Sequence, residues 1–435
     1  MTVNYLKEAK TSKKAVAEEI SRTVSQILTD IEAGGEDAVR RYTEKLDGWT
    51  GDVVVRPYAF EAARKGLSET VKDDIRFAHR RVHDFASAQR DSMHEFEVEL
   101  IDGLVTGQRL IPVETAGCYV PGGRFAHAAS VIMSVTTAKV AGVTNVIAAS
   151  PPNKDRGGVH PGILYAMEVA GADRVLALGG VQGIAALAFG LFGGPRADIL
   201  VGPGNAYVAE AKRLLFGRIG IDIIAGPTEV MIVADETADP AFVAADLAGQ
   251  AEHGPDSPAW LVTTSRQLGE EVMERMPTVM ECLPDAPRRS AQAAWRDFGE
   301  VVQVDTREEA CSVCDRYAPE HLQVQAADLN WWLHNLRCYG SLFLGEETTV
   351  AYGDKCSGPN HILPTMGAAR YTGGLSVSKF IKTLTYQRMT REANRSIAPV
   401  ASRISRLEGM EGHAMTADIR LGKYFPGEKF NLAKG

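Results

Sequence analysis

The sequence predicts an α/β protein, and three kinds of segment carry that prediction. Short apolar runs each lead into a loop rich in Gly or Pro, and they span residues 146–149, 175–178 and 199–201. Segments with helical spacing at 161–171 and 181–191 separate these runs. Alternating strand, loop and helix is typical of a parallel sheet with crossover helices. A second series of apolar runs, near 259–264, 300–304 and 341–345, predicts a second sheet. We therefore expect two Rossmann-like α/β lobes, with helices at the N-terminus and a helical and extended segment at the C-terminus.

The remaining segments complete this division. Apolar residues recur every three or four positions from Ser12 to about Leu46 and from Ala59 to Arg90, which predicts N-terminal helices, the first ending at Gly34-Gly35. Residues 94–112 have short β-like runs, and the chain after Phe380 is expected to form a helix and then an extended tail. The expected domains are 1–112, packing on the second lobe, 113–235 as an NAD-binding lobe, 236–379 with metal and catalytic residues, and 380–435 reaching a partner subunit.

Composition narrows the class of protein. The chain has 435 residues, of which 45% are hydrophobic and 23% charged, as in folded globular proteins of several domains. The net charge of −8 argues against a nucleic-acid partner. No run of about 18 uncharged apolar residues predicts a membrane span, and the N-terminus lacks an apolar signal segment. We therefore expect a cytoplasmic protein with no membrane partner.

Six cysteines in so long a chain are too few for a disulfide framework and are expected to be thiols. Cys311 and Cys314 form a C-x-x-C pair, but no second pair or matching histidines follow nearby. A structural zinc site needs four such ligands. Metal or redox chemistry at this pair is therefore the less favoured interpretation.

Two Gly-rich loops mark a candidate ligand site. Residues 179–182 and 202–205 follow predicted strands of the first lobe. In an open α/β sheet, ligands bind beyond the carboxyl ends of the strands, so both loops are expected at one edge. Taken alone, such a loop equally fits simple packing of helix on strand. No acidic residue at the usual spacing indicates a dinucleotide in the standard Rossmann pose.

Three polar segments of the second lobe have side chains suited to catalysis. Gln250 and His253 share a face if their segment is helical, which suits a divalent metal or a histidine that caps a surface helix. Glu320 and His321 suit proton transfer near neutral pH or form a structural pair. Residues 352–361 form a turn-rich polar loop, either a site or a solvated turn.

Eight motifs, in order along the chain, resemble the histidinol dehydrogenase family. They are CYVPGG (118–123), GGVQGIAALAFG (179–190), VGPGNAYVAEAK (201–212), AGPTEV (225–230), GQAEHGPDS (249–257), APEHL (318–322), GDKCSGPNHILPT (353–365) and EGMEGH (408–413). The resemblance implies one Zn²⁺ per site, two NAD used in succession, and oxidation of a primary alcohol through an aldehyde to a carboxylate. It also implies a homodimer in which the C-terminal segment enters the partner's site.

The resemblance assigns roles by motif position. The implied zinc ligands are Gln250, His253, Asp354 and, from the neighbouring subunit, His413. The implied proton-transfer pair is Glu320 and His321. The implied NAD contacts are Tyr119, Gln182 and Asn205. The implied substrate contacts are Thr228, His361 and Glu408.

Several residues depart from the biosynthetic pattern of the family. Lys355 stands directly after the expected ligand Asp354, where an aromatic or aliphatic residue is usual, and Thr228 replaces a common Ser. With residues 369–374, these departures resemble a catabolic branch that oxidises 2,3-dihydroxypropane-1-sulfonate to 3-sulfolactate. Lys355 and Arg370 are suited to binding a sulfonate through charge-assisted hydrogen bonds, or they lie on the surface beside acidic neighbours. The alternatives are oxidation of L-histidinol to L-histidine and a non-catalytic paralogue.

Overall fold

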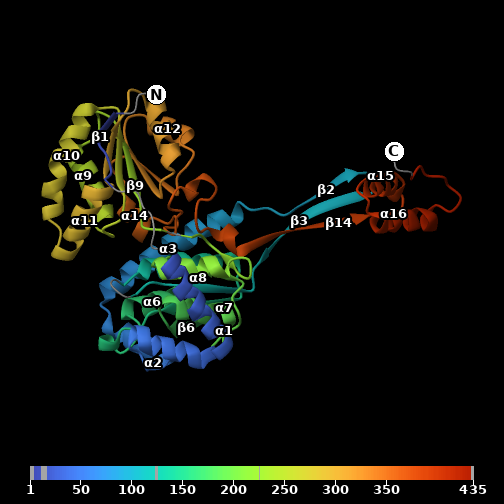
Figure 1. Cartoon of the computed structure of the whole chain (residues 1–435), viewed down its shortest axis with the longest axis horizontal. Coiled ribbons are helices and arrows are strands. Elements are labelled where there is room, and N and C mark those ends of the chain that lie inside the picture. The colour runs from blue at the N-terminus through green and yellow to red at the C-terminus, as the bar shows by residue number, and fades with distance from the viewer. Residues whose placement is uncertain (1–3, 11–16, 123–125, 225, 433–435) are drawn as a thin grey trace. The chain divides into compact units, whose positions relative to one another are not determined.

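A computed structural model describes residues 4–10, 17–122, 126–224 and 226–432 of the chain (Figure 1). The chain divides into two compact units. The first unit comprises Met1–Arg90 and Val113–Phe380, and the second comprises Asp91–Pro112 and Ile381–Gly435. Both parallel sheets belong to the first unit, a grouping that differs from the four consecutive domains expected from the sequence. None of the described helices is both long and apolar enough to cross a lipid bilayer.

A five-stranded parallel sheet forms one layer of the first unit, and the predicted α/β class is confirmed. Its strand order is β6-β5-β4-β7-β8. The strands are β4 (Thr115–Tyr119), β5 (Asn145–Ser150), β6 (Arg174–Ala177), β7 (Ile199–Val201) and β8 (Gly220–Ile221). Three of the strands match the predicted apolar runs. Strand β4 was not predicted, because its TAGCY sequence has only one β-branched residue, Thr115, and has a central glycine that disfavours a strand.

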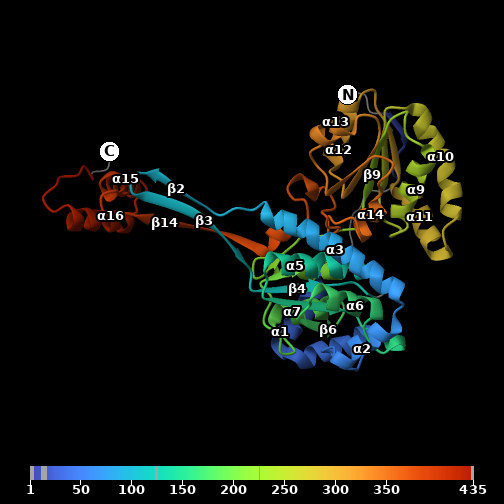
Figure 2. The same ribbon diagram turned by 180° about the vertical axis from the view of Figure 1, so that it is seen from behind.

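Helices cover this sheet (Figure 2). They are α1 (Ala17–Asp47), α2 (Pro57–Gly66), α3 (Glu69–Asp91), α4 (Ala128–Val131), the π-helical η1 (Ile132–Thr136), α5 (Thr137–Ala141), the 3-10 turn η2 (Lys154–Arg156), α6 (Pro161–Ala170), α7 (Gly180–Phe189) and α8 (Ala206–Leu215). Helix α1 packs on α7 and α8, and α2 packs on α6. The apolar spacing of α1 explains its docking, because Val24, Ile27 and Ile31 lie in one core with Ile184 and Leu187.

The N-terminal region therefore packs differently from the expectation. Residues 1–112 were expected on the second lobe, but α1 and α2 pack on the helices of the five-stranded sheet. Within the described part of residues 1–112, β1 (Asn4–Lys7) alone joins the other sheet, where it pairs antiparallel with β11. The predicted stop at Gly34-Gly35 is confirmed, because Gly35 has non-helical backbone angles (φ 55°, ψ −139°), and a second helical segment follows it across a kink within α1.

The second sheet has six strands in the order β1-β11-β10-β9-β12-β13, and its pairings other than β1 with β11 are parallel. Its further strands are β9 (Val230–Ala234), β10 (Ala259–Thr263), β11 (Glu300–Gln303), β12 (His321–Gln325) and β13 (Ser341–Leu344). The predicted strands near 259–264, 300–304 and 341–345 are confirmed. The adjacent interior strands β9 and β12 were not predicted as strands.

Alternate residues of β9 face opposite cores. Val230 and Ile232 pack with α9 (Pro240–Ala251), α10 (Arg266–Glu281) and α11 (Asp285–Phe298). Met231 and Val233 pack with α12 (Arg307–Tyr317) and α13 (Leu329–Asn335). Figure 1 shows α9, α10 and α11 together on one side of the sheet and α12 on the other. A strand buried on both faces is a continuous apolar run, as VMIVA is.

Asp354 lies on a helix, where the sequence suggested a loop. Helix α14 spans Val350–Lys355, so the expected loop of residues 352–361 begins only at Cys356. Two 3-10 turns follow, η3 (Ala368–Arg370) and η4 (Val377–Phe380).

The second compact unit is a three-stranded antiparallel sheet with two helices. The sheet order is β14-β3-β2, formed by β2 (Phe96–Ile101), β3 (Leu104–Pro112) and β14 (Ile381–Met389). Helices α15 (Asn394–Leu407) and α16 (Glu411–Tyr424) pack together around Leu421 and Phe425. The tail expected as helix and then extended chain therefore begins with a strand, whose partner β3 lies far away in the sequence.

Candidate active site

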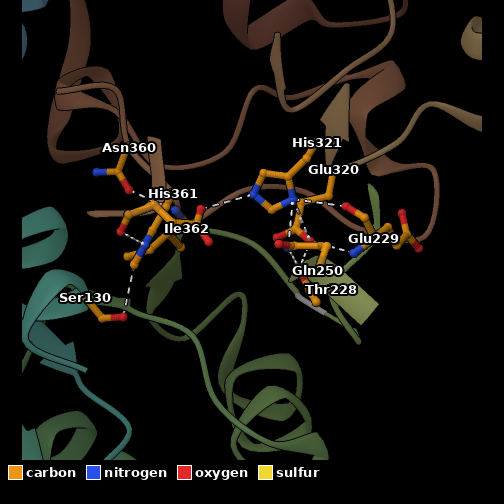
Figure 3. A network of polar contacts seen from close by, with 10 residues as sticks. Ser130, Thr228, Glu229, Gln250, Glu320, His321, Asn360, His361 and Ile362 are labelled. Carbon is orange, nitrogen blue, oxygen red and sulfur yellow. Dashed lines mark hydrogen bonds and ion pairs between the residues drawn. The ribbon is translucent and has the colours of Figure 1, made fainter. Parts of the chain in front are cut away.

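Polar side chains gather at the amino ends of two adjacent interior strands of the six-stranded sheet, β9 and β12. Thr228 and Glu229 directly precede β9, and Glu320 directly precedes β12, whose first residue is His321. Val230 and His321 are paired across the two strands, which places these groups side by side. Helix α9 returns antiparallel to β9, so its last turn brings Gln250 to the same edge. Distant motifs thereby meet in one place (Figure 3).

Glu320 is a buried carboxyl group with two donors on one oxygen. The Thr228 hydroxyl donates to its Oε2 over 2.6 Å, and the Glu229 N–H donates to the same atom over 2.9 Å. Burial raises the pKa of Glu320 to about 7, although His321 and these hydrogen bonds oppose the rise. A carboxyl group that titrates near neutral pH can both give and take a proton.

His321 lies between two carboxylates. Its Nδ1 is 3.0 Å from the Glu229 carbonyl oxygen and 3.5 Å from Glu320 Oε2, and its Nε2 is 3.3 Å from Asp354 Oδ1 (Figure 3). Burial alone would lower the pKa of His321, but Glu320 and Asp354 together raise it to about 9. The backbone carbonyl can only accept, so Nδ1 carries a proton and Nε2 is the nitrogen available for proton exchange.

His361 is held in one orientation by two neighbours. Its Nδ1 lies 2.9 Å from the Asp354 carbonyl oxygen, and its Nε2 lies 3.0 Å from Ser130 Oγ. Burial lowers the pKa of His361 to about 4, so the ring is neutral. Nδ1 therefore donates to the carbonyl, and Nε2 accepts from the Ser130 hydroxyl. The side chain of Asp354 stays ionised, because His321, His361 and Lys355 outweigh its burial and lower its pKa to about 2.

Three of the four expected zinc ligands, Gln250, His253 and Asp354, lie in the first compact unit, and their side chains can bind a metal ion. Desolvation lowers the pKa of His253, which favours the neutral imidazole that metals bind, and the charge of Asp354 acts on this ring. The Nε2 of Gln250 donates to Thr228 over 2.8 Å, and no hydrogen bond to its Oε1 is formed by a described residue. Among the described residues no group of three or more His, Cys, Asp and Glu side chains forms a metal site. The donor set therefore fits zinc only with Gln250 included and with a further ligand from elsewhere.

The expected cofactor residues line one cavity of about 620 Å³. Tyr119 ends β4, Gln182 lies in the first turn of α7, and Asn205 precedes α8, so all three lie at the carboxyl edge of the five-stranded sheet. The Gly180 N–H donates to the Tyr119 hydroxyl over 3.0 Å, and Gln182 Nε2 donates to Asp47 over 2.8 Å. The buried Gln182 Oε1 has no partner among the described residues. An unpaired buried acceptor in a cavity wall fits a site for a ligand that donates hydrogen bonds.

A second cavity of about 690 Å³ adjoins the catalytic groups and is lined by Thr228, His253 and Met366. Asn205 lines both cavities, so they share a wall. A cofactor in one cavity and a substrate in the other would therefore be neighbours.

The two expected anion contacts have different surroundings. Lys355 is exposed, and it forms no ion pair or hydrogen bond with a described residue. Its charge lowers the pKa values of His127, His253 and His361, which places it among the site's imidazoles. Arg370 is exposed and donates instead to the main-chain carbonyls of Gly367 and Arg316.

Some residues of the site were not predicted, and two predicted ones lie in the other unit. His413 is in α16 and Glu408 directly follows α15, both in the second compact unit. Ser130, Glu229 and His127 were not singled out. Glu229 acts mainly through backbone atoms, which no sequence pattern reveals, and a lone histidine such as His127 has no spacing signal.

Comparison with known proteins accounts for this arrangement. The model of the histidinol dehydrogenase family matches residues 10–421. The chain is 56% identical over 432 residues to sulfopropanediol 3-dehydrogenase of Ruegeria pomeroyi, with 99% of each chain covered. It is 41% identical to histidinol dehydrogenase of Thermus thermophilus, over 92% of this chain and 94% of that one. The crystal structure of histidinol dehydrogenase from Elizabethkingia anophelis superimposes with a TM-score of 0.89 at 32% identity, covering 95% of this chain and 94% of that one. The chain belongs to the histidinol dehydrogenase family of oxidoreductases.

Proposed function

We propose that this protein is a zinc- and NAD-dependent dehydrogenase that oxidises a primary alcohol through an aldehyde to a carboxylate. The favoured reaction is 2,3-dihydroxypropane-1-sulfonate to 3-sulfolactate. One observation supports the chemistry most strongly: Glu320, His321 and Asp354 form a continuous buried set beside a cavity. The identity of 56% to a sulfopropanediol 3-dehydrogenase supports the substrate.

Gln250, His253 and Asp354 would hold the zinc, and His413 of a second subunit would complete the set. Bound zinc supplies Lewis acidity, which polarises a substrate oxygen and favours its deprotonation. The assembly would be a homodimer in which the second compact unit contributes His413 and Glu408. Thr228 and His361 would line the substrate pocket.

His321 accepts the alcohol proton in the first oxidation. Its Nε2 is the exchanging nitrogen, since Nδ1 is engaged by the Glu229 carbonyl. A cation held by Asp354 would offset that carboxylate's charge and would favour the neutral, proton-accepting form of His321, because the charge is one cause of the raised pKa of His321. The alcohol carbon loses a hydride as its oxygen loses the proton, and an aldehyde forms.

Glu320 acts in the second oxidation. Its carboxylate removes a proton from water as the oxygen adds to the aldehyde carbon, which gives a hydrate that again has a hydrogen on carbon. Loss of that hydride and of a hydroxyl proton leaves the carboxylic acid. Bound NAD would supply the hydride acceptor for each oxidation, so one alcohol, one water and two NAD⁺ would give one acid, two NADH and two protons. Tyr119, Gln182 and Asn205 would contact each of the two NAD molecules that bind one after the other.

The charge of Lys355 favours an anionic alcohol. Lys355 forms no ion pair with a described residue, and its charge acts on three imidazoles of the site and on the Asp354 carboxylate, lowering their pKa values. A sulfonate is a permanent anion with acceptor oxygens, and it would bind such a lysine by charge-assisted hydrogen bonds. Protonated histidinol would be repelled by the same charge.

The test is the initial rate of NAD reduction with each alcohol under identical conditions. We expect turnover of 2,3-dihydroxypropane-1-sulfonate and little or none of L-histidinol. Turnover of histidinol alone would make the protein a biosynthetic enzyme. Zinc-loaded protein that turned over neither alcohol would favour another substrate or the non-catalytic alternative.

A further inference from the structure

We propose that Asp246 is a positioning residue that fixes the three elements carrying Gln250, His321 and Asp354. This inference rests on the proposed function, because it concerns the same metal and proton-transfer groups. Asp246 lies on α9, one helical turn before Gln250. None of the family motifs contains it, and nothing in its local sequence marks it.

The Asp246 carboxylate collects donors from two other elements. Its Oδ2 accepts from Gln323 Nε2 over 2.7 Å and from Gln325 Nε2 over 2.8 Å, both on β12. Its Oδ1 accepts from Thr349 Oγ1 over 2.9 Å, and Thr349 directly precedes α14. Gln323 Nε2 also donates to the Thr348 carbonyl over 2.9 Å, which joins β12 to the start of α14 without passing through Asp246.

The residues that bond to Asp246 lie on β12 or directly before α14, the elements that hold the site residues His321 and Asp354. His321, Gln323 and Gln325 alternate along β12 and therefore point to the same side of the sheet. Thr349 begins the short helix whose second turn holds Asp354. The Asp246 carboxylate thus links three elements of the site. Helix α9 provides the proposed ligand Gln250, β12 provides the proton-transfer residue His321, and α14 provides the proposed ligand Asp354.

The hydrogen bonds that Asp246 accepts from Gln323, Gln325 and Thr349 need an ionised carboxylate. The Oε1 atoms of Gln323 and Gln325 are buried without a partner among the described residues. Both amides therefore turn their N–H groups toward Asp246 and leave their own acceptors unpaired. An Asn side chain has one acceptor and would direct an N–H₂ group at other donors, so Asp246→Asn breaks the arrangement while conserving volume.

Loss of the Asp246 hydrogen bonds should weaken zinc binding at the site. Removing an outer residue that orients metal ligands typically weakens metal affinity by roughly 10- to 100-fold. We expect Asp246→Asn to weaken zinc binding within this range and to lower kcat for the proposed oxidation. The KM for NAD should stay unchanged, because the cofactor cavity lies on the other sheet.

The experiment measures zinc bound to the full-length protein by metal analysis after dialysis against buffered free Zn²⁺, which does not depend on activity. Asp235→Asn is the matched control. The Asp235 carboxylate also accepts a hydrogen bond from the chain next to β12, in this case from the Ala327 N–H over 2.8 Å. This contact lies at the opposite edge of the same sheet. Thr349→Val against Thr349→Ser provides a milder pair, in which valine removes one hydrogen bond and serine retains the hydroxyl.

The inference predicts weaker zinc binding in Asp246→Asn and Thr349→Val, and wild-type affinity in Asp235→Asn and Thr349→Ser. If Asp246→Asn fails to fold, the Thr349 pair decides. Zinc affinities equal to wild type in Asp246→Asn and Thr349→Val would overturn the positioning role and leave the proposed function intact. An equal loss in Asp235→Asn would overturn it too, because the loss would then follow from removing any hydrogen-bonded carboxylate of this sheet. Absence of zinc binding in the wild type would overturn both proposals.

Discussion

Nε2 of His321 lies 3.3 Å from Oδ1 of Asp354, although 33 positions separate them in the sequence. The contact joins the first residue of β12 to α14, and it places a proton-exchanging nitrogen beside a carboxylate suited to bind a cation. This pair connects the proposed metal chemistry with the proposed proton transfer.

Asp354→Asn should abolish stable zinc binding. The change removes the ionised ligand while keeping the volume of the side chain, so the affinity should fall by more than the roughly 100-fold typical of outer residues. Zinc content after dialysis against buffered free Zn²⁺ measures the effect. Full retention of zinc would show that Asp354 is not a ligand.

Glu320 should control the pH dependence of acid formation from the aldehyde. Its pKa is raised to about 7, so the carboxyl is protonated below that pH and becomes a base above it. The rate should therefore rise with pH up to about 7 and then level off. Glu320→Gln should lower the rate by roughly 10²- to 10⁴-fold, the usual contribution of a general base, and should remove this rise.

Single-turnover oxidation of supplied aldehyde across pH 5 to 9 measures this effect, a range chosen to lie about two units on either side of the expected pKa. The first oxidation, followed with the alcohol, serves as the internal control, since it is assigned to His321. An unchanged pH profile in Glu320→Gln would assign water activation to another group.

Lys355 should set the preference for an anionic substrate. Lys355→Gln should raise the KM for the sulfonated diol by about 10- to 100-fold, since a hydrogen bond to a charged group contributes roughly 1.5–3 kcal/mol. Arg370→Gln is the matched comparison, because Arg370 already donates to two main-chain carbonyls. A large effect of Arg370 and none of Lys355 would reverse the assignment.

Gln182 should affect NAD and not the alcohol. Gln182→Met keeps the length of the side chain but removes the donor to Asp47 and the unpaired acceptor in the cavity wall. The KM for NAD should rise about tenfold, the equivalent of one hydrogen bond of about 1.4 kcal/mol. Gln26→Met is the control, since Gln26 also donates to an aspartate but lies on the exposed face of α1. Equal KM values for the two variants would exclude Gln182 from cofactor binding.

The sequence predicted β5, β6 and β7 of one sheet and β10, β11 and β13 of the other, because short apolar runs between turn signals are a local pattern. It did not predict β12, because HLQVQ is short and polar at three of its five positions, and its glutamines find their partners only in the folded protein: both donate to Asp246, 77 and 79 positions away, and Gln323 also donates to the Thr348 carbonyl. The predicted helix stop at Gly34-Gly35 matches the break in helical backbone angles at Gly35, because glycine adopts a positive φ without steric cost.

In the candidate site too, the sequence identified some residues through local motifs and missed others that depend on the folded structure. The family motifs identified Gln250, Glu320 and Asp354, which the structure brings to one edge of one sheet or to the helix beside it. They did not identify Glu229, whose carbonyl and N–H contact His321 and Glu320. Asp246 was missed for a different reason, since its partners are defined only by the folded sheet.

The central claim is that one alcohol is oxidised twice at a single zinc site. The most direct measurement is the yield of NADH and of 3-sulfolactate from a limiting amount of 2,3-dihydroxypropane-1-sulfonate, with zinc-loaded enzyme and excess NAD. We predict two NADH and one carboxylate for each alcohol consumed, with no aldehyde accumulating. One NADH with released aldehyde, or no reaction with this alcohol while L-histidinol is oxidised, would contradict the account.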